Sequence, residues 1–383
     1  MRRRYREKHE FSGSAREKEA LLQRVLVFML CLFGSAWSAS AQVTPAAGFT
    51  PPDDTPSIRI GMTLYTDFTY TQNPQQKDAD GNTINFSQFN LSRSYINITG
   101  QVSHIVNFRI TPDIMRETAP RSSLNGSLTF RLKYGYAQFN LDDWMPRGSW
   151  VRLGLQQTPW VDFEEGIYRY RFQGTVFSER EGFLSSSDAG ASFHYSLPAN
   201  YGELHAGLYN GETYSKAEVN NEKAFQVRGT VRPFAGMAPV LRGVRAHVFY
   251  DGDRYAMSAD RRRLVGSVTF EHAYLNAGFD YLDAKDRTSI ARPDLTGKGY
   301  SIWATPKSPM GFEALLRYDQ LKPNTLFDTQ LHKRTIVGVS YWFPHQGAVS
   351  SAILFDVDSA TFPDNVPAQP RQTRIAVHGL VSF

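Results

Sequence analysis

Arginine is the residue type with the clearest chemical potential in this sequence. Beyond residue 41 the chain contains 25 arginines and only 9 lysines. A guanidinium keeps its charge at physiological pH and presents a planar pair of donors to a carboxylate or a phosphate. Many of these cations alternate with apolar residues, which predicts a wet face that favours anions. Alternatively, they only keep a wall wet, balanced by acids such as Asp280 and Glu313. The candidate cations are Arg59, Arg109, Arg131, Lys133, Arg152, Arg228, Arg232, Arg245, Arg317, Arg334 and Arg374.

A second set of charged residues lies in one long polar segment, residues 158–187. Its acids outnumber its bases; the set is Asp162, Glu164, Glu165, Arg169, Arg171, Glu179, Arg180 and Glu181. Acids that face a basic wall produce a transverse field, which orients polar solutes rather than capturing a single anion. The predicted opposing groups are Arg109, Arg131 and Arg152 on the wall and Asp162, Glu164 and Glu165 on the segment.

The first 41 residues have the pattern of an export signal. Basic residues precede the apolar run 25–33, and Ala39-Ser40-Ala41 has the small-x-small pattern of a signal peptidase site. An uncleaved anchor is the alternative, but the run is too short to span a bilayer. Without this segment 34 basic and 33 acidic residues remain, a net charge of +1, which argues against nucleic acid as a partner.

The elements that must position these charges are strands. Apolar and polar residues alternate along about sixteen segments, a period that is typical of β-structure with one wet face. The predicted strands are 57–70, 87–101, 105–112, 127–141, 149–157, 188–197, 202–210, 222–233, 242–251, 262–271, 274–283, 297–305, 310–320, 333–343, 349–357 and 372–383.

The connections between these segments alternate between short turns and longer polar loops. A closed antiparallel barrel of the outer membrane has short periplasmic turns and long extracellular loops, whereas a soluble sandwich has no reason to alternate. We therefore predict an all-β transmembrane barrel over residues 57–383, preceded by a signal peptide (1–41) and a periplasmic tail (42–56). Residues 158–187 form the predicted constriction loop.

The last predicted strand ends on Phe383, after alternating apolar positions at Ile375, Val377 and Val381. This pattern resembles the strand that the outer-membrane assembly machinery recognises. We therefore expect Phe383 to act as an assembly signal. As a bare edge strand of a soluble fold, the segment would instead be an aggregation hazard.

Short motifs add a family resemblance over about residues 58–383. They are Leu153–Pro159, Ser178–Glu181, Ser187–Ala191, Tyr209–Gly211 and Val227–Gly229. In this order and spacing they resemble the phosphate-selective porins of the O and P type. The resemblance implies a homotrimer of sixteen-stranded barrels in which the third outer loop folds into the lumen. The scarcity of lysine departs from the family pattern.

Together these features predict an outer-membrane porin for passive diffusion of small hydrophilic solutes, with a preference for anions that extends to phosphate in the family. The expected partners are the lipid bilayer, lipopolysaccharide, the assembly machinery, and small anionic or neutral solutes. No cofactor or metal is expected, since the histidines are dispersed without metal-ligand spacing and Cys31 is the only cysteine. The alternatives are a barrel hydrolase, whose catalytic set geometry rather than spacing would reveal, and an adhesin without an open pore.

Overall fold

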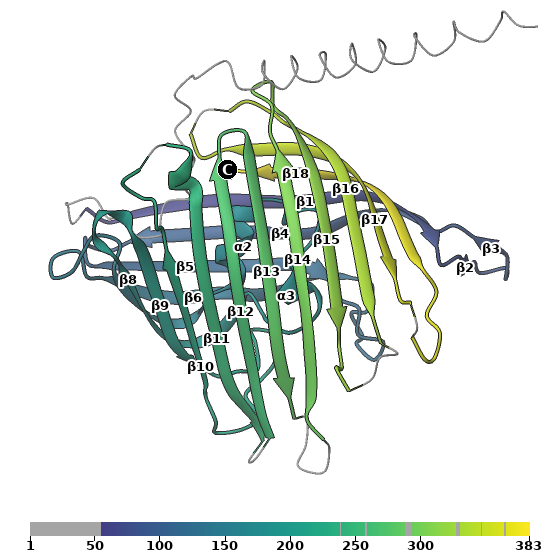
Figure 1. Cartoon of the computed structure of the whole chain (residues 1–383), viewed down its shortest axis with the longest axis horizontal. Helices are drawn as coiled ribbons and strands as arrows, with labels where there is room; N and C mark the ends of the chain where they lie inside the picture. Colours follow the sequence, from purple (N-terminus) through teal and green to yellow (C-terminus); the bar gives the residue numbers. More distant parts are fainter. Residues whose placement is uncertain are drawn as a thin grey trace, which may run out of the picture. The chain divides into compact units, whose positions relative to one another are not determined.

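The computed structural model describes residues 55–383, apart from residues 238, 257–258, 288–292, 327–329, 346 and 364. The predicted signal peptide and most of the predicted tail lie outside the described residues. Within the described part, sixteen antiparallel strands follow one another around a closed barrel, which confirms the predicted fold class (Figure 1).

The strands agree closely with the segments of period two. In chain order they are β1 (Ser57–Asn73), β4 (Ser87–Gln101), β5 (Val106–Arg116), β6 (Leu128–Asn140), β7 (Trp150–Gln157), β8 (Ser187–Ser196), β9 (Gly202–Tyr209), β10 (Ala224–Val231), β11 (Val244–Ala256), β12 (Ala259–His272), β13 (Leu275–Asp286), β14 (Leu295–Pro306), β15 (Phe312–Lys322), β16 (His332–Trp342), β17 (Ser350–Thr361) and β18 (Gln372–Ser382). A small hairpin, β2 (Gln76–Lys77) and β3 (Thr83–Ile84), lies outside the barrel sheet. Helices are few: α2 (Val161–Tyr168), α3 (Phe177–Arg180) and the short 3-10 turns η1 (Pro198–Asn200) and η2 (Leu241–Gly243).

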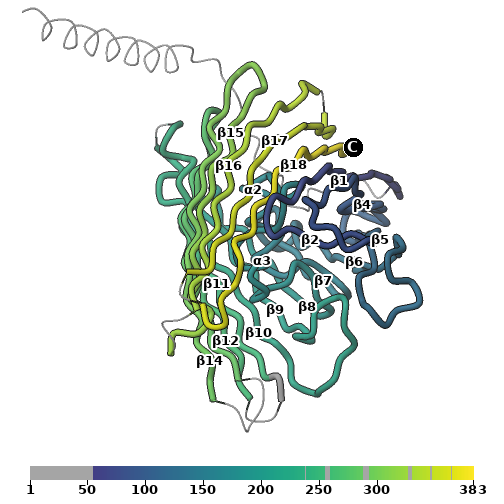
Figure 2. The backbone as a smooth tube through the Cα atoms, turned by 90° about the vertical axis from the view of Figure 1, so that its right-hand side faces the viewer, coloured from purple at the N-terminus to yellow at the C-terminus, as the bar shows by residue number. Residues whose placement is uncertain are grey.

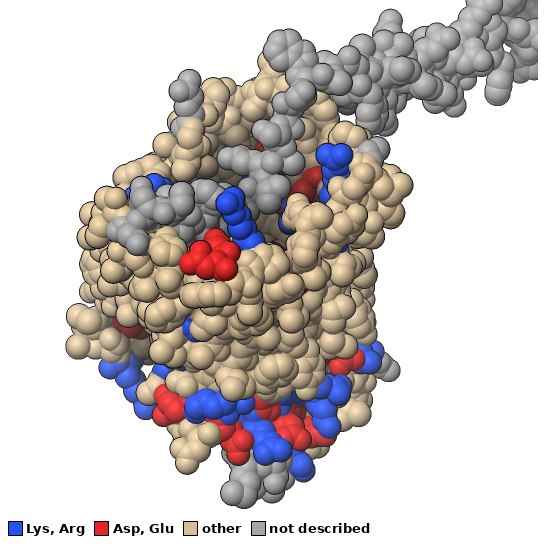
Figure 3. All heavy atoms as spheres, turned by 90° about the vertical axis from the view of Figure 1, so that its left-hand side faces the viewer, with Lys and Arg blue, Asp and Glu red and all other residues tan. Residues whose placement is uncertain are grey.

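The two faces of the wall differ in the way the alternation requires. Apolar side chains point outward, and Ile60 (70%), Phe130 (68%) and Phe355 (52%) are among the most exposed. Figure 3 shows a broad uncharged band across this face, with some charged atoms above it and a dense group of both signs at the lower end. A sheet face of this kind is suited to lipid. Among the described residues, none of the helices has the length and apolar character needed to cross a bilayer.

The barrel closes where β1 pairs with β18. The register runs from Thr63 opposite Ser382 to Asn73 opposite Thr373. Phe383 extends this ladder, because its backbone N–H donates to the Met62 oxygen and its oxygen accepts from the Met62 N–H, both at 3.0 Å. The Phe383 side chain is 59% exposed.

One predicted loop is wrong. The polar segment between residues 251 and 262 was expected to be a long connection, but β11 continues to Ala256 and β12 begins at Ala259. Charged pairs extend this hairpin beyond the apolar zone, since Arg254 bonds to Asp260 across it at 3.3 Å. The strand wall is therefore taller here than the hydrophobic pattern alone predicts.

Residues 158–186, here called the inner loop, connect β7 to β8 and contain α2 and α3. The inner loop lies inside the ring of strands (Figure 2). The base of the loop is closed by Thr158, whose N–H donates to the Ser186 oxygen at 3.1 Å. Buried aromatic residues then pack the loop against the inner wall. The cluster includes Trp160, Tyr168, Tyr170, Phe172 and Phe177 from the loop and Phe249, Leu282, Leu315, Ile336 and Leu354 from β11, β13, β15, β16 and β17.

This packing corrects the expectation of a uniformly polar inner face. The inner positions of β11–β18 carry an apolar strip as well as charges, and the inner loop covers it. Burial of such large aromatic residues contributes several kcal/mol to holding a segment in place. The inner loop is consequently fixed to one side of the lumen.

Candidate functional site

A narrow cavity lies between the inner loop and the wall opposite its apolar contact. Its volume is about 170 Å³. It is lined by Thr63, Tyr65, Tyr95, Asn97, Arg109, Lys133, Tyr134, Asp162, Glu165 and Arg171. Cations and phenols of β1 and β4–β6 thus face two carboxylates and one guanidinium of the inner loop.

A bulge in β6 brings two side chains to the cation side of the narrow cavity. Thr111 pairs with Tyr134 and Pro112 with Leu132, so Lys133 is the extra residue, and both Lys133 and Tyr134 are buried within the barrel. Bulges re-aim side chains in this way. The Lys133 ammonium lies 4.8 Å from the Tyr95 ring and 5.2 Å from the Tyr134 ring.

Arg109 completes the cation side. Its guanidinium donates to the Asn97 amide oxygen at 2.8 Å and lies 4.6 Å from the Tyr134 ring. Within the described part of the chain, neither Arg109 nor Lys133 forms an ion pair with a carboxylate. Aromatic rings and neutral oxygens hold both cations in place while their charge stays uncompensated.

The carboxylates on the loop side are held by specific partners. The Tyr134 hydroxyl donates to Asp162 at 2.5 Å, and Arg171 pairs with Glu165 at 2.7 Å. Burial raises the pKa of Glu165 to about 8, against the opposing effect of Arg171. Basic and acidic groups thus face each other across the narrow cavity, the arrangement expected from the sequence for Arg109, Asp162 and Glu165.

Glu164 lies away from this cavity, contrary to the expected opposition of charges. It is 3% exposed and turned toward Asp280 on β13. Burial, with the neighbouring Asp280 carboxylate second, raises the pKa of Glu164 well above its usual range. Glu164 is therefore not among the residues that line the narrow cavity. In a helix, consecutive residues face different sides, which is why Glu164 and Glu165 separate.

The other charged residues of the inner loop anchor it rather than line the narrow cavity. Arg169 pairs with Glu313 at 3.1 Å, Arg180 with Asp358 at 3.6 Å, and Glu179 lies 4.0 Å from Arg171. Arg180 and Glu181 line a separate cavity of about 210 Å³ near His332 and Lys333.

Most of the remaining wall cations lie beside acids, although Asp113 and Asp358 each serve more than one cation. Arg131 lies 3.7 Å from Asp113, and Arg228 pairs with Glu203 at 2.6 Å. Arg245 pairs with Glu271, and Arg317 with Asp319. Arg334 and Arg374 both pair with Asp358. Arg59 is exposed near the beginning of β1. The wall is rich in arginine, but its uncompensated charge is concentrated at few positions.

A wide cavity of about 680 Å³ continues from the narrow one, since Arg109 and Asp162 line both. Six arginines line it against three acids, and two of these acids are the partners of Arg228 and Arg245. The arginines are Arg109, Arg147, Arg152, Arg228, Arg232 and Arg245. The charge excess is therefore positive on this side of the inner loop.

Sequence reasoning missed the tyrosines of the narrow cavity and the histidines of the wide one. The alternation of apolar and polar residues assigns side chains to one face or the other, but it does not show which of them meet at a cavity. The tyrosines that meet there are Tyr65, Tyr95 and Tyr134. His194 and His205 share the wide cavity although they lie on different strands. Only the register between strands, in which His194 pairs with His205, brings them together. Among residues 55–383, gaps excepted, no group of three or more potential ligands is arranged to hold a metal ion.

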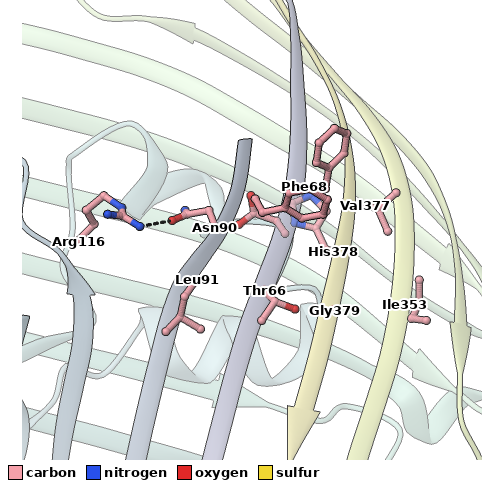
Figure 4. Close-up of a pocket in the computed structure, with 11 residues that line it drawn as sticks. Thr66, Phe68, Asn90, Leu91, Arg116, Ile353, Val377, His378 and Gly379 are labelled. Carbon is pink, nitrogen blue, oxygen red and sulfur yellow. Dashed lines mark hydrogen bonds between the residues drawn. The ribbon is translucent and has the colours of Figure 1, made fainter. Parts of the chain in front are cut away.

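A groove on the outside of the barrel is separate from these cavities. It has a volume of about 570 Å³ and crosses the seam of β1 and β18, where outward Phe68, Ile353 and Val377 line it (Figure 4). At its other end, Arg116 donates to the Asn90 amide oxygen at 3.5 Å. Because the lining is mostly outward and apolar, the groove is not part of the candidate site.

Comparison with known proteins identifies a fold. No known family profile matches the sequence, and no curated protein is significantly similar in sequence. Among solved structures, the anion-selective porin from Comamonas acidovorans is similar with a TM-score of 0.61 at 12% identity, over 86% of this chain and 100% of that chain. Salmonella typhi OmpF in complex with daunomycin has a TM-score of 0.57 at 11% identity, over 85% and 97%. The outer membrane channel DcaP of Acinetobacter baumannii has a TM-score of 0.55 at 12% identity, over 88% and 100%.

Proposed function

We propose that this chain is an outer-membrane porin that lets small hydrophilic solutes diffuse passively through its lumen. The observation that carries the proposal is the combination of an outward apolar face with an inner loop that leaves contiguous polar cavities along one side of the barrel. A sixteen-stranded barrel is too wide for wall side chains alone to fill. The short connections then lie in the periplasm and the long ones outside the cell. The function requires neither a catalytic residue nor a cofactor.

We further infer a preference for anions. Arg109 and Lys133 are uncompensated at the narrow cavity, and the wide cavity carries a positive excess. Protein walls around a narrow space lower the effective dielectric and strengthen these fields relative to bulk water. Phosphate is one of the anions that this field would favour. The wall cations of the narrow cavity are Arg109 and Lys133, and these two do not make the lysine cluster that a phosphate-specific site would need.

The proposed porin also has a proposed oligomeric state, a homotrimer, and proposed partners, the lipid bilayer and lipopolysaccharide. A homotrimer is supported by fold likeness, since one similar structure is the trimer form of Vibrio cholerae OmpT, with a TM-score of 0.56 at 10% identity. The apolar outer face suits a lipid bilayer, and the ionic outer ends of β11–β14 suit the headgroup region of lipopolysaccharide.

Liposomes that contain the purified barrel are expected to become permeable to small sugars, because passive diffusion needs only an open lumen. Swelling rates in isotonic arabinose, glucose and sucrose would measure this permeability and should fall with sugar size. Liposomes that stay impermeable to all three sugars would contradict the porin function, while heat-modifiable migration on a gel would show that the barrel had folded.

Deletion of Phe383 is expected to lower the amount of folded barrel in the outer membrane much more than it lowers synthesis. The deletion removes an aromatic side chain from the outward face of the closing ladder and two backbone hydrogen bonds to Met62. Quantitative comparison of heat-modifiable protein with total protein would test this. Phe130→Ala is the control, because Phe130 is also an exposed phenylalanine, at 68% against 59% for Phe383. Equal folded fractions for wild type and deletion would show that Phe383 is no assembly signal.

A further inference from the structure

Three buried nitrogens of the residues that line the wide cavity have no hydrogen-bond partner; one belongs to Arg245, which is paired with Glu271, and the other two belong to residues without an ion pair in the described part of the chain. These two are Nη2 of Arg152 on β7 and Nε2 of His205 on β9. Arg152 is 3% exposed and His205 is 5% exposed, and both residues line the wide cavity. A buried polar group that finds no partner costs about 1–3 kcal/mol, so such a pair indicates that an acceptor completes the site.

Aromatic rings hold Arg152 in a fixed position. Its guanidinium carbon lies 3.8 Å from the Trp150 ring and 4.6 Å from the Tyr136 ring. Its Nε and Nη1 atoms donate to the amide oxygens of Gln138 and Gln157 at 2.8 and 3.1 Å. Neutral partners therefore satisfy three sides of the guanidinium, while its charge and its remaining nitrogen are left for an anion.

His205 is brought close to Arg152 by the same tryptophan. The Trp150 ring stacks on His194 at 5.0 Å and makes an edge contact with His205 at 5.0 Å. The nearby acid Glu203 is already bound to Arg228 at 2.6 Å and lies 3.4 Å from His194. The acid on the inner loop, Asp162, accepts from Tyr134. Asp162 accepts through Oδ2 while its Oδ1 has no partner, yet in the described part of the chain neither acid pairs with Arg152 or bonds to His205.

The rest of the lining selects among anions. Opposite these donors the wide cavity includes apolar side chains, namely Pro146, Pro159, Phe163, Ile167, Leu197 and Pro198. A hydrated inorganic ion gains nothing from such a surface, whereas an organic anion buries its hydrocarbon part there.

Resting on the proposed porin function, we propose that Arg152 and His205 form a binding subsite for the carboxylate of an organic solute, with its apolar part against the apolar lining of the wide cavity. The guanidinium supplies a charge-assisted hydrogen bond and the imidazole N–H a second one. The subsite lies on the side of the inner loop that holds the short connections, so it would hold a solute after passage through the narrow cavity.

Three probes separate the contributions to binding. Benzoate carries both a carboxylate and an apolar body, inorganic phosphate has charge without an apolar body, and benzyl alcohol has the body without charge. We expect benzoate to reduce chloride conductance of reconstituted barrels at concentrations at least several-fold lower than phosphate, and benzyl alcohol to have no effect. Equal or stronger inhibition by phosphate would overturn the proposal of an organic carboxylate.

Variants assign the effect to the subsite. Loss of a charge-assisted hydrogen bond is worth about 1.5–3 kcal/mol, so Arg152→Gln should weaken benzoate inhibition about tenfold or more, and His205→Phe should weaken it by a smaller factor. His247→Gln is the matched control, because both ring nitrogens of His247 already bond to Thr230 and Thr269. Inhibition that is the same in wild type and Arg152→Gln would overturn the assignment.

A binding measurement keeps this test independent of the porin function. Equilibrium dialysis of labelled benzoate against the folded barrel in detergent needs no conduction. If the barrel binds benzoate through Arg152 but conducts no ions, the subsite stands and the porin function fails. If the barrel conducts but binds no benzoate, the porin function stands and the subsite fails.

Discussion

Replacing Arg109 and Lys133 with glutamine is expected to shift the reversal potential under a potassium chloride gradient from anion preference toward cations. These two cations line the narrow cavity and form no ion pair within the described part of the chain, so an ion that passes through this cavity comes close to both. Unit charges about 4 Å apart interact by roughly 1–4 kcal/mol between water and a protein surface, and the lower end of this range already corresponds to about fivefold in permeability per charge. Asp162 and Glu165 would then dominate the field.

The reciprocal change should have the opposite sign. Asp162→Asn with Glu165→Gln removes the acidic side and leaves Arg171 with Glu179 alone, at 4.0 Å, so the reversal potential should move toward anions. Glu164→Gln is the matched control, because this carboxyl is one residue away but faces Asp280 on β13 instead of the narrow cavity, and its amide replacement can donate a hydrogen bond to Asp280. Added salt should reduce both shifts because it screens the charges.

Two results would contradict the assignment of the narrow cavity. If both double variants keep the wild-type reversal potential at low salt, solutes do not pass between Arg109 and Glu165. If Glu164→Gln produces a shift as large as that of the acidic double variant, its side chain faces the pore rather than β13.

The strands could be predicted from the sequence because lipid on one side and water on the other enforce a period of two. The prediction for β9, residues 202–210, differs from the observed Gly202–Tyr209 by a single residue. Prediction was least accurate at the outer ends, as in β11 and β12, where ion pairs replace apolar residues and the period carries no contrast. Backbone pairing continues there between polar residues, so a hydrophobic pattern cannot locate the ends of these strands.

The site was harder to predict because its geometry depends on contacts between distant segments. The sequence indicated that arginines face inward, but it did not show that Arg228 and Arg245 would be neutralised by Glu203 and Glu271. Nor could the alternation reveal that Leu315 and Ile336 face inward among polar residues to receive the inner loop. An inward apolar residue breaks the rule for a wet wall, and only the aromatic content of the inner loop offered a signal for it.

That contact between loop and wall leads to the second large effect: Trp160→Ala should release α2 from the wall. Trp160 is 1% exposed and packs beside Phe249 at a ring distance of 6.0 Å. Truncation of a buried tryptophan costs about 3–5 kcal/mol, and here the cost falls on loop docking because the strand ladders do not involve this residue. Single-channel conductance should become larger and fluctuate between levels, while barrel folding on gels stays intact.

A graded series would attribute this effect to docking rather than to general damage. Tyr170→Phe keeps the ring but removes hydroxyl bonds to Glu313 at 3.0 Å and Ser340 at 2.8 Å, so its effect on conductance should be smaller, at a cost of about 1–3 kcal/mol. Trp144→Ala, at a 67% exposed tryptophan in the turn after β6, should leave conductance unchanged. A single, wild-type conductance level in Trp160→Ala would mean that the ion pairs of Arg169 and Arg180 hold the inner loop without its aromatic contact.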